Sequence, residues 1–161
     1  MSKIIIREIE SSDNEQIAKV IRQVLTDFNV PKEGSAYSDA SLNDMTKAYS
    51  IERGVYYVVL ADGLVLGGGG IAPLDNYEGN VCELQKMYLL DAARGKGVGK
   101  KLIIQCLQKA REFGFDGCYL ETMPNMKIAQ KIYNHLGFEY LDGPMGDTGH
   151  CACPVWMYKK F

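Results

Sequence analysis

The stretch Arg94-Gly95-Lys96-Gly97-Val98-Gly99-Lys100 is the most informative part of this sequence. It lies between an apolar, strand-like run that ends at Leu90 and an amphipathic, helix-like run. Glycines allow a tight turn and the close approach of a bulky anion. The first N–H groups of a helix lack partners within it and, with the helix dipole, form an anion site. The stretch therefore predicts a pyrophosphate-binding turn. Four basic side chains add positive charge there: Arg94, Lys96, Lys100 and Lys101.

Two better-known glycine motifs do not match this turn. A Walker A loop has four residues between its glycines, whereas three separate Gly95 from Gly99, and Lys100 is followed by another lysine. A dinucleotide fingerprint would need a glycine at position 100. A strand-to-helix turn without a ligand stays open when the loop is considered alone.

Strand and helix patterns follow one another on both sides of the turn. The predicted strands are 4–9, 55–60, 64–71, 81–90, 117–122, 138–141 and 155–159. The predicted helices are 15–28, 42–49, 98–113 and 125–136. Ser12 and Glu15 have capping-box spacing, and the glycine run 67–70 indicates a bulge or a close backbone approach. Three successive strands imply antiparallel pairing, so we expect one α/β domain, 1–161, of mixed α+β type, with a mixed, mostly antiparallel, twisted sheet and helices on both faces.

Composition excludes several classes of protein. The 161 residues are 47% hydrophobic and 24% charged, with a formal net charge of −2, which indicates neither a nucleic-acid nor a membrane partner. The apolar run 4–6 is too short for a signal peptide, and the five cysteines are expected to be reduced, so we predict a cytoplasmic location. His150, Cys151 and Cys153 lie close together, but no second cluster completes a tetrahedral site, so no metal is predicted.

The surroundings of the turn resemble the GNAT superfamily of N-acetyltransferases. The family motif Gln/Arg-x-x-Gly-x-Gly/Ala is matched by Arg94, Gly97 and Gly99, after a strand that ends in Lys86-Met87-Tyr88-Leu89-Leu90. A second family element, a strand and a helix that ends in Tyr-x-x-x-Gly-Phe, is matched by 117–122 and by the segment 125–138. The resemblance is close over 55–141 and looser in the N-terminal strand and helix.

This resemblance implies a GNAT-like acyltransferase fold that binds acetyl-CoA as cosubstrate. The pyrophosphate would lie on the glycine turn, and the pantetheine arm would pair with the strand that ends near Leu89, in a slot where the strand 117–122 splays away. A backbone N–H near Leu89 would polarise the thioester carbonyl. The residues implied to bind the cosubstrate are Met87, Tyr88, Leu89, Arg94, Gly95, Lys96, Gly97, Val98, Gly99, Lys100 and Asn125. For Asn125 a helix N-cap is the simpler interpretation.

The resemblance also indicates two catalytic side chains. Glu83 is the candidate base, and regular alternation would place it on the same face as Met87 and Leu89. Its alternative is a surface or salt-bridged glutamate. Tyr133 is the candidate acid for the departing thiolate, expected near the edge of the core, and its alternative is an amphipathic core tyrosine.

We therefore predict transfer of an acetyl group to a primary amine of a small molecule or peptide, by direct attack in a ternary complex. The alternative is a catalytically inactive module that binds acyl-CoA for regulation. The acceptor is expected between 29–50 and 142–154. His150 could shape the pocket there, but a loop without a direct function is the favoured interpretation. Carboxylates able to attract a cationic amine are Asp39, Asp44, Glu52, Asp142 and Asp147. Homodimers occur in the family, but the sequence indicates no interface.

Overall fold

A computed structural model describes residues 3–161, so Met1 and Ser2, at the start of the N-terminal run, lie outside the described residues. Seven strands form one sheet in the order β1-β2-β3-β4-β5-β7-β6. All neighbours pair antiparallel except β4 and β5, which are parallel. The predicted mixed, mostly antiparallel sheet is therefore confirmed. The strands are β1 (Ile4–Glu8), β2 (Val55–Ala61), β3 (Leu64–Pro73), β4 (Val81–Leu89), β5 (Gly117–Thr122), β6 (Glu139–Leu141) and β7 (Val155–Lys160).

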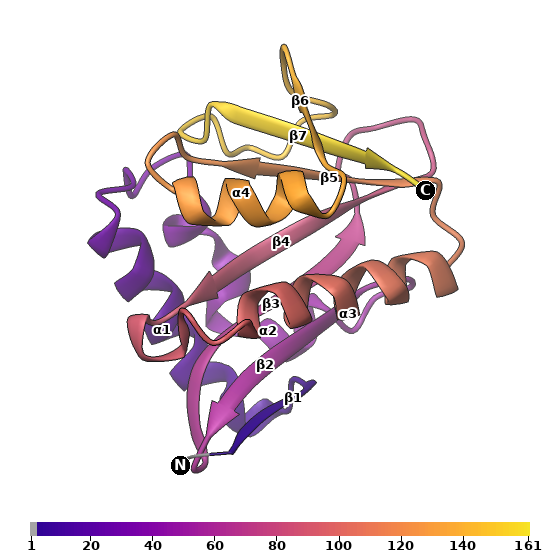
Figure 1. Ribbon diagram of the computed structural model, residues 1–161. Coiled ribbons are helices and arrows are strands. Elements are labelled where there is room, and N and C mark those ends of the chain that lie inside the picture. The colour runs from indigo at the N-terminus through magenta and orange to yellow at the C-terminus, as the bar shows by residue number, and fades with distance from the viewer. Residues whose placement is uncertain (1–2) are drawn as a thin grey trace.

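Helices cover both faces of the sheet, as predicted (Figure 1). α1 (Asn14–Asp27) and the short α2 (Met45–Ala48) pack on one face, and α3 (Val98–Glu112) and α4 (Lys127–His135) pack on the other. Each face has its own apolar core. Short 3-10 turns join the elements: η1 (Ser11–Asp13), η2 (Ala36–Ser38), η3 (Ala40–Asn43) and η4 (Asp91–Ala93). No helix in the described part of the chain is long and apolar enough to cross a membrane.

Two predicted helix starts are wrong in detail. The capping box uses Glu10 and Asp13, not Ser12 and Glu15, and it caps the 3-10 turn η1 that leads into α1. Asp13 is buried and accepts a 2.8 Å hydrogen bond from Arg7. This charged partner stabilises a buried carboxylate at the capping position. The segment 42–49 is not one helix, since η3 ends before Asp44, which caps α2.

The glycine run in β3 lies where strand β4 bulges. The register between the two strands shifts between Gly68 and Gly70, opposite Lys86, whose φ is 50°. The Tyr56 ring lies against Gly68 and Gly70, where any Cβ would collide with it, and the Tyr56 hydroxyl donates a 2.7 Å hydrogen bond to the Lys86 carbonyl. The expected close approach is therefore present, whereas the bulge lies on β4 opposite the glycines and not in the glycine run.

Strands β4 and β5 separate soon after they meet. Their ladder joins Val81–Glu83 to 117–119, and no further pair links them among the described residues. The Leu90 N–H donates to Leu66 on the β3 side, so alternation directs the Leu89 N–H and C=O to the opposite, unpaired edge. The sheet therefore opens beside the second half of β4, which is the predicted slot.

Candidate functional site

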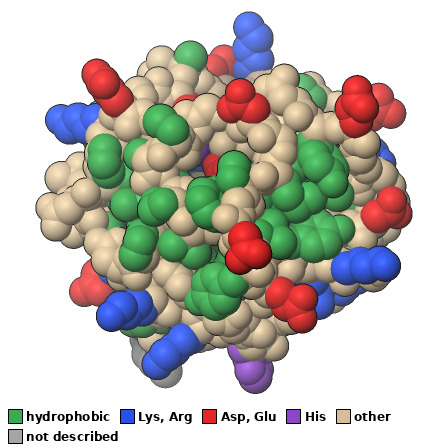
Figure 2. Space-filling model, turned by 90° about the horizontal axis from the view of Figure 1, so that it is seen from above, with side chains coloured by type: hydrophobic (Ala, Val, Ile, Leu, Met, Phe, Trp, Pro, Cys, Tyr) green, Lys and Arg blue, Asp and Glu red, His purple; other side chains and the backbone are tan. Residues whose placement is uncertain are grey.

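Two cavities flank the opening between β4 and β5. The apolar cavity has a volume of about 380 Å³ and lies between β4, the start of α3, α4 and the end of α1. The polar cavity, of about 390 Å³, lies between β4, the segment 36–51 and the loop before β7. A junction cavity of about 40 Å³ shares lining residues with both. Figure 2 shows a hollow in the face at the β6–β7 end, with hydrophobic side chains beside it.

The glycine turn forms an open cradle at one end of the apolar cavity. Gly95 and Gly97 both have positive φ, and a Cβ at either would meet no atom within 4 Å. Gly97 is the N-cap of α3 and no side chain caps the helix, so the first N–H groups of α3 are available to an anion. Lys96 and Lys100 are exposed beside it, whereas the Val98 side chain is buried, so only its backbone faces a ligand.

Arg94 connects the turn to the cavity. Its Nε donates a 2.9 Å hydrogen bond to the Leu89 carbonyl on the unpaired edge of β4, and its guanidinium lies 5.1 Å from the centre of the Phe28 ring. Gly99 also lines the cavity. The predicted strand residues Met87, Tyr88 and Leu89 form one wall of it. The structure therefore brings the turn and the strand to one elongated, mainly apolar space.

Asn125 is not a helix cap. The N-cap of α4 is Met126, and the Asn125 side chain instead donates a 2.8 Å hydrogen bond to the Phe28 carbonyl at the end of α1. This contact joins the two helices on either side of the apolar cavity, which Asn125 itself lines. Sequence spacing could not show it, because the partner lies 97 positions away.

Tyr133 faces the core and not its edge, which corrects the prediction. It is the buried residue of α4, whereas Ile132 and Leu136 are half-buried. Its ring packs edge-on against Phe138 at 5.7 Å, and burial raises the pKa of its hydroxyl. Tyr133 lines both the apolar and the junction cavity, and its hydroxyl has no hydrogen-bond partner among residues 3–161. The hydroxyl is thus placed to contact a ligand at the opening.

Glu83 lies in the polar cavity and is 5% exposed. Burial, followed by the charge of Glu121, raises its pKa to about 7, although the hydrogen bond from Gln85 works in the opposite direction. Gln85 Nε2 donates to Glu83 at 2.8 Å, and the Tyr49 hydroxyl donates to Gln85 at 2.7 Å. This chain of hydrogen bonds fixes a carboxyl group whose pKa is near neutrality.

The bulge overturns the expected alternation along β4. Leu84 and Met87 face α3, whereas the consecutive residues Gln85 and Lys86 both line the polar cavity. Glu83 therefore does not share a face with Met87 and Leu89. The bulge places Glu83 in the polar cavity while Met87 and Leu89 line the apolar one.

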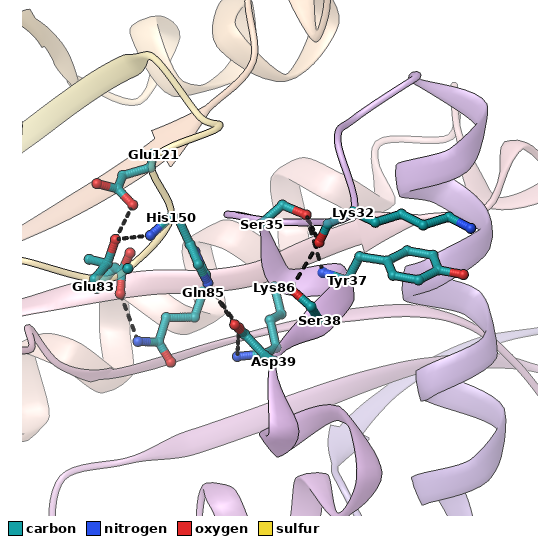
Figure 3. A network of polar contacts seen from close by, with 12 residues as sticks. Lys32, Ser35, Tyr37, Ser38, Asp39, Glu83, Gln85, Lys86, Glu121 and His150 are labelled. Atoms are coloured by element: carbon teal, nitrogen blue, oxygen red, sulfur yellow. Dashed lines mark hydrogen bonds and ion pairs between the residues drawn. The ribbon is translucent and has the colours of Figure 1, made fainter.

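Asp39, Lys86 and His150 form a charged cluster in the polar cavity (Figure 3). His150 Nε2 lies 2.9 Å from Asp39 Oδ2, and Lys86 Nζ lies 3.5 Å from the same oxygen. The hydrogen bond with Asp39 raises the pKa of His150. Burial alone would raise the pKa of Asp39, but the hydrogen bond and charge of His150, with the charge of Lys86, lower it. Asp39 is therefore a paired carboxylate.

Several pocket residues were missed from the sequence. Glu121, on β5, accepts hydrogen bonds from the Thr148 and Tyr119 hydroxyls, and Figure 3 shows it near Glu83 and His150. Its position on the strand predicted to line the slot could have indicated that Glu121 lies in the pocket. Of the other carboxylates expected to attract an amine, Asp44 caps α2, and Glu52, Asp142 and Asp147 are exposed outside the polar cavity.

The cysteines are free thiols in the described chain. Cys151 is exposed, whereas Cys153 is buried beside the polar cavity, where burial raises its pKa to about 11. Within residues 3–161 no group of three or more His, Cys, Asp or Glu side chains is arranged to hold a metal ion. His135 is exposed on α4.

Comparison with known proteins places this geometry in a family. The model of the Acetyltransferase (GNAT) family matches residues 19–138. The uncharacterized N-acetyltransferase YjgM of Escherichia coli K12 is 45% identical over 157 residues, 97% of this chain and 94% of that protein. Human N-acetyltransferase 8B is 31% identical over 136 residues, 80% of this chain and 57% of that protein.

Solved structures share the fold. A GNAT acetyltransferase from Staphylococcus aureus Mu50 superposes with a TM-score of 0.84 at 24% identity, over 98% of this chain and 99% of that one. The structure of yncA from Salmonella typhimurium with its cofactor acetyl-CoA gives a TM-score of 0.77 at 18% identity, over 99% and 94%. With the family model matched from the first helix to the end of the Tyr-x-x-x-Gly-Phe element, the chain belongs to the GNAT family of acetyltransferases.

Proposed function

We propose that this protein transfers an acetyl group from acetyl-CoA to a primary amine, by direct attack within a ternary complex. One observation carries the proposal: an apolar cavity that starts at an open glycine turn meets an acid-lined polar cavity at the gap between β4 and β5. The structural neighbour yncA was solved with acetyl-CoA, and the PaiA N-acetyltransferase from Thermoplasma acidophilum was solved in complex with coenzyme A.

The residues along the apolar cavity fit coenzyme A. The free N–H groups at the start of α3, with Arg94, Lys96 and Lys100 nearby, suit the pyrophosphate. The space above Gly95 and Gly97 admits it without a collision. The unpaired edge of β4 at Leu89 supplies backbone groups to an extended amide-bearing arm, and the apolar lining excludes water around it.

The chain's own residues divide the proton movements. When bound, acetyl-CoA supplies the activated acyl carbon. Glu83 accepts a proton from the acceptor amine, directly or through water, as the C–N bond forms. The Tyr133 hydroxyl donates a proton to the sulfur as the C–S bond breaks, and the Leu89 N–H stabilises the negative charge on the carbonyl oxygen. A pKa of about 7 suits Glu83 to this role at neutral pH.

Two measurements on one sample test the function. Acetyl-CoA should raise the melting temperature, because a ligand that binds only the folded state stabilises it. Thiol release should then follow when amines are added. Stabilisation without thiol release from a broad amine panel would favour the inactive binding module. The absence of any stabilisation at saturating acetyl-CoA would refute the proposal.

Gly97→Glu tests the cradle. The new side chain adds bulk and negative charge where the pyrophosphate is proposed, so acetyl-CoA affinity should fall at least about a hundredfold. Gly114→Glu is the matched control, since Gly114 also has positive φ and open space but follows the far end of α3. Calorimetric titration of both folded variants measures the effect. Equal affinities would remove the turn from the binding site.

A further inference from the structure

The polar cavity contains a buried cation that the proposed proton transfer does not use. The Lys86 side chain is 8% exposed and lines both the polar and the junction cavity. Its contact with Asp39 is 3.5 Å long, and it makes no shorter polar contact within the described chain. The ammonium also lies 5.8 Å from the centre of the Tyr49 ring, and its three donors leave room for an additional anionic partner from the cavity.

The backbone is strained in order to place this lysine. Lys86 has a φ of 50°, in the left-handed region that a lysine rarely adopts. In a regular strand the residue after Gln85 would face the apolar core under α3, but the bulge turns Lys86 into the polar cavity beside Gln85. Strain of this kind persists where the surrounding structure holds it, and here the Tyr56 hydroxyl holds the Lys86 carbonyl.

His150 supplies a second donor in the same cavity. His150 uses Nε2 for Asp39, and its Nδ1 has no partner in the described part of the chain. Asp39 favours the protonated ring, which makes Nδ1 a donor. Two cations, Lys86 and His150, thus share one carboxylate at ion-pair distance. Glu83 and Glu121 line the same cavity, and neither forms an ion pair among residues 3–161, although the charges of His150 and Lys86 act to lower the pKa of Glu83.

We propose that the acceptor is a small amino acid with a free carboxylate, whose amine is held by Glu83 and whose carboxylate is bound by Lys86 and His150. This inference rests on the proposed acetyl transfer and narrows its substrate. The cavity holds acidic and basic side chains together, so the amine of a small molecule can pair with an acid while its carboxylate pairs with the cations. Its volume of about 390 Å³ suits a small ligand.

The reaction balances without another reagent. The acceptor nitrogen forms a bond to the acetyl carbon, the carbon–sulfur bond breaks, and coenzyme A leaves as a thiol. The ammonium form of the acceptor loses two protons in all, one to Glu83 and one that ends on the sulfur or in solvent. Its carboxylate keeps its charge and stays with Lys86 and His150 throughout.

Pairs of acceptors that differ only in the carboxylate test whether the enzyme recognises this group. Thiol release at saturating acetyl-CoA is measured with L-alanine, L-methionine and L-phenylalanine, each as the free acid and as the carboxamide. The amine of the carboxamide is less basic, so chemistry alone favours the amide. We expect kcat/KM for at least one free acid to exceed that for its amide by about tenfold or more, as a buried charge-assisted hydrogen bond provides.

The variant Lys86→Met tests whether Lys86 causes the preference for the free acid over the carboxamide. It keeps most of the length of the side chain and removes the charge, so the ratio of kcat/KM for the acid to kcat/KM for the amide should fall about tenfold or more. Lys86→Arg should restore part of the preference. Lys19→Met, which removes an exposed lysine on α1, is the matched control and should keep the wild-type preference.

The outcomes separate this inference from the function it rests on. Thiol release with amides equal to acids, or an unchanged preference in Lys86→Met, would overturn the inference and leave the acetyltransferase intact. If no acceptor is turned over, calorimetric binding of N-acetyl-L-methionine and its carboxamide to the coenzyme A complex decides. A preference for the acid that Lys86→Met abolishes supports the carboxylate site while counting against catalysis. No preference overturns the site.

Discussion

At the scale of single residues, Glu83 gives the protein its sharpest pH dependence. Because burial raises its pKa to about 7, the carboxyl group is only partly ionised at neutral pH. A base must be deprotonated, so kcat/KM for the acceptor should rise as pH increases through about 7. Glu83→Gln should lower kcat by about a hundredfold or more and remove this inflection. A pH–rate profile of both proteins measures it.

The pH dependence of the melting temperature is the control for the pH–rate profile. The folded-state pKa of Glu83 is raised, so the folded protein holds this proton more tightly than the unfolded chain does. The stability that Glu83 contributes as a neutral acid is therefore lost as pH rises from about 4.5 to about 7. Glu83→Gln should raise the melting temperature relative to wild type at pH 8 and change it little at pH 5. A variant that is less stable at both values would indicate misfolding and not the loss of a base.

Tyr133 acts through a hydroxyl without a protein partner. Tyr133→Phe keeps the packing against Phe138 and removes only this group, so the fold should persist. We expect kcat to fall by about a hundredfold while the affinity for acetyl-CoA changes less than threefold, because a general acid acts on the leaving sulfur. Single-turnover kinetics and titration of acetyl-CoA separate the two effects. Wild-type turnover would remove Tyr133 from the mechanism.

At the scale of elements, the bulge in β4 decides which side chains reach which cavity. Tyr56→Phe removes the hydrogen bond to the Lys86 carbonyl and should destabilise the protein by about 1 kcal/mol, a fall in Tm of roughly 2–4 °C. The acceptor KM should rise with it, because Lys86 is held less firmly. Tyr37→Phe is the control, since the Tyr37 hydroxyl makes no hydrogen bond in the described chain. A similar Tm for Tyr56→Phe and wild type would show that the bulge does not need this bond.

Most elements could be predicted from the sequence, since apolar periodicity and glycine turns are local signals. The order of strands and helices, the glycine turn and the splayed slot follow from such signals and from the family resemblance. A bulge was an open possibility, but its position at Lys86 could not be predicted. The left-handed backbone there falls on a lysine, a residue type with no preference for that conformation. The wrong prediction that Glu83 and Met87 share one face of β4 follows from this single bulged residue.

At the scale of the whole molecule, two distant loops close the polar cavity. His150 in the loop before β7 contacts Asp39, and the Ala152 N–H donates a 2.9 Å hydrogen bond to the Gly34 carbonyl. These partners are more than a hundred positions apart, so the sequence could indicate each loop but not their contact. The cluster of Asp39, Lys86 and His150 was therefore not predictable as a unit.

This loop contact should be stronger in acid than in alkali. The Asp39 hydrogen bond raises the pKa of His150, so the stability it contributes is complete below about 6.5 and is lost as pH rises through the folded-state pKa. Lys86, Glu83 and Asp39 are the other charged groups that face the ring. His150→Gln should lower Tm more at pH 6 than at pH 9. An equal loss at both values would mean that the charge of His150 does not hold the loops.

The bare centre of strand β3 sets a limit on how this protein can change. A Cβ at Gly67, Gly68 or Gly70 would collide with a backbone oxygen of a neighbouring strand, and at Gly68 and Gly70 with the Tyr56 ring as well. These three positions are thus closed to ordinary substitution, whereas a Cβ at Gly69 would meet only the movable end of the Met87 side chain. A side chain could be added at Gly68 or Gly70 only after Tyr56 had been replaced by a smaller residue, and that replacement alone would leave a destabilising void. We therefore expect β3 and its two neighbouring strands to change together.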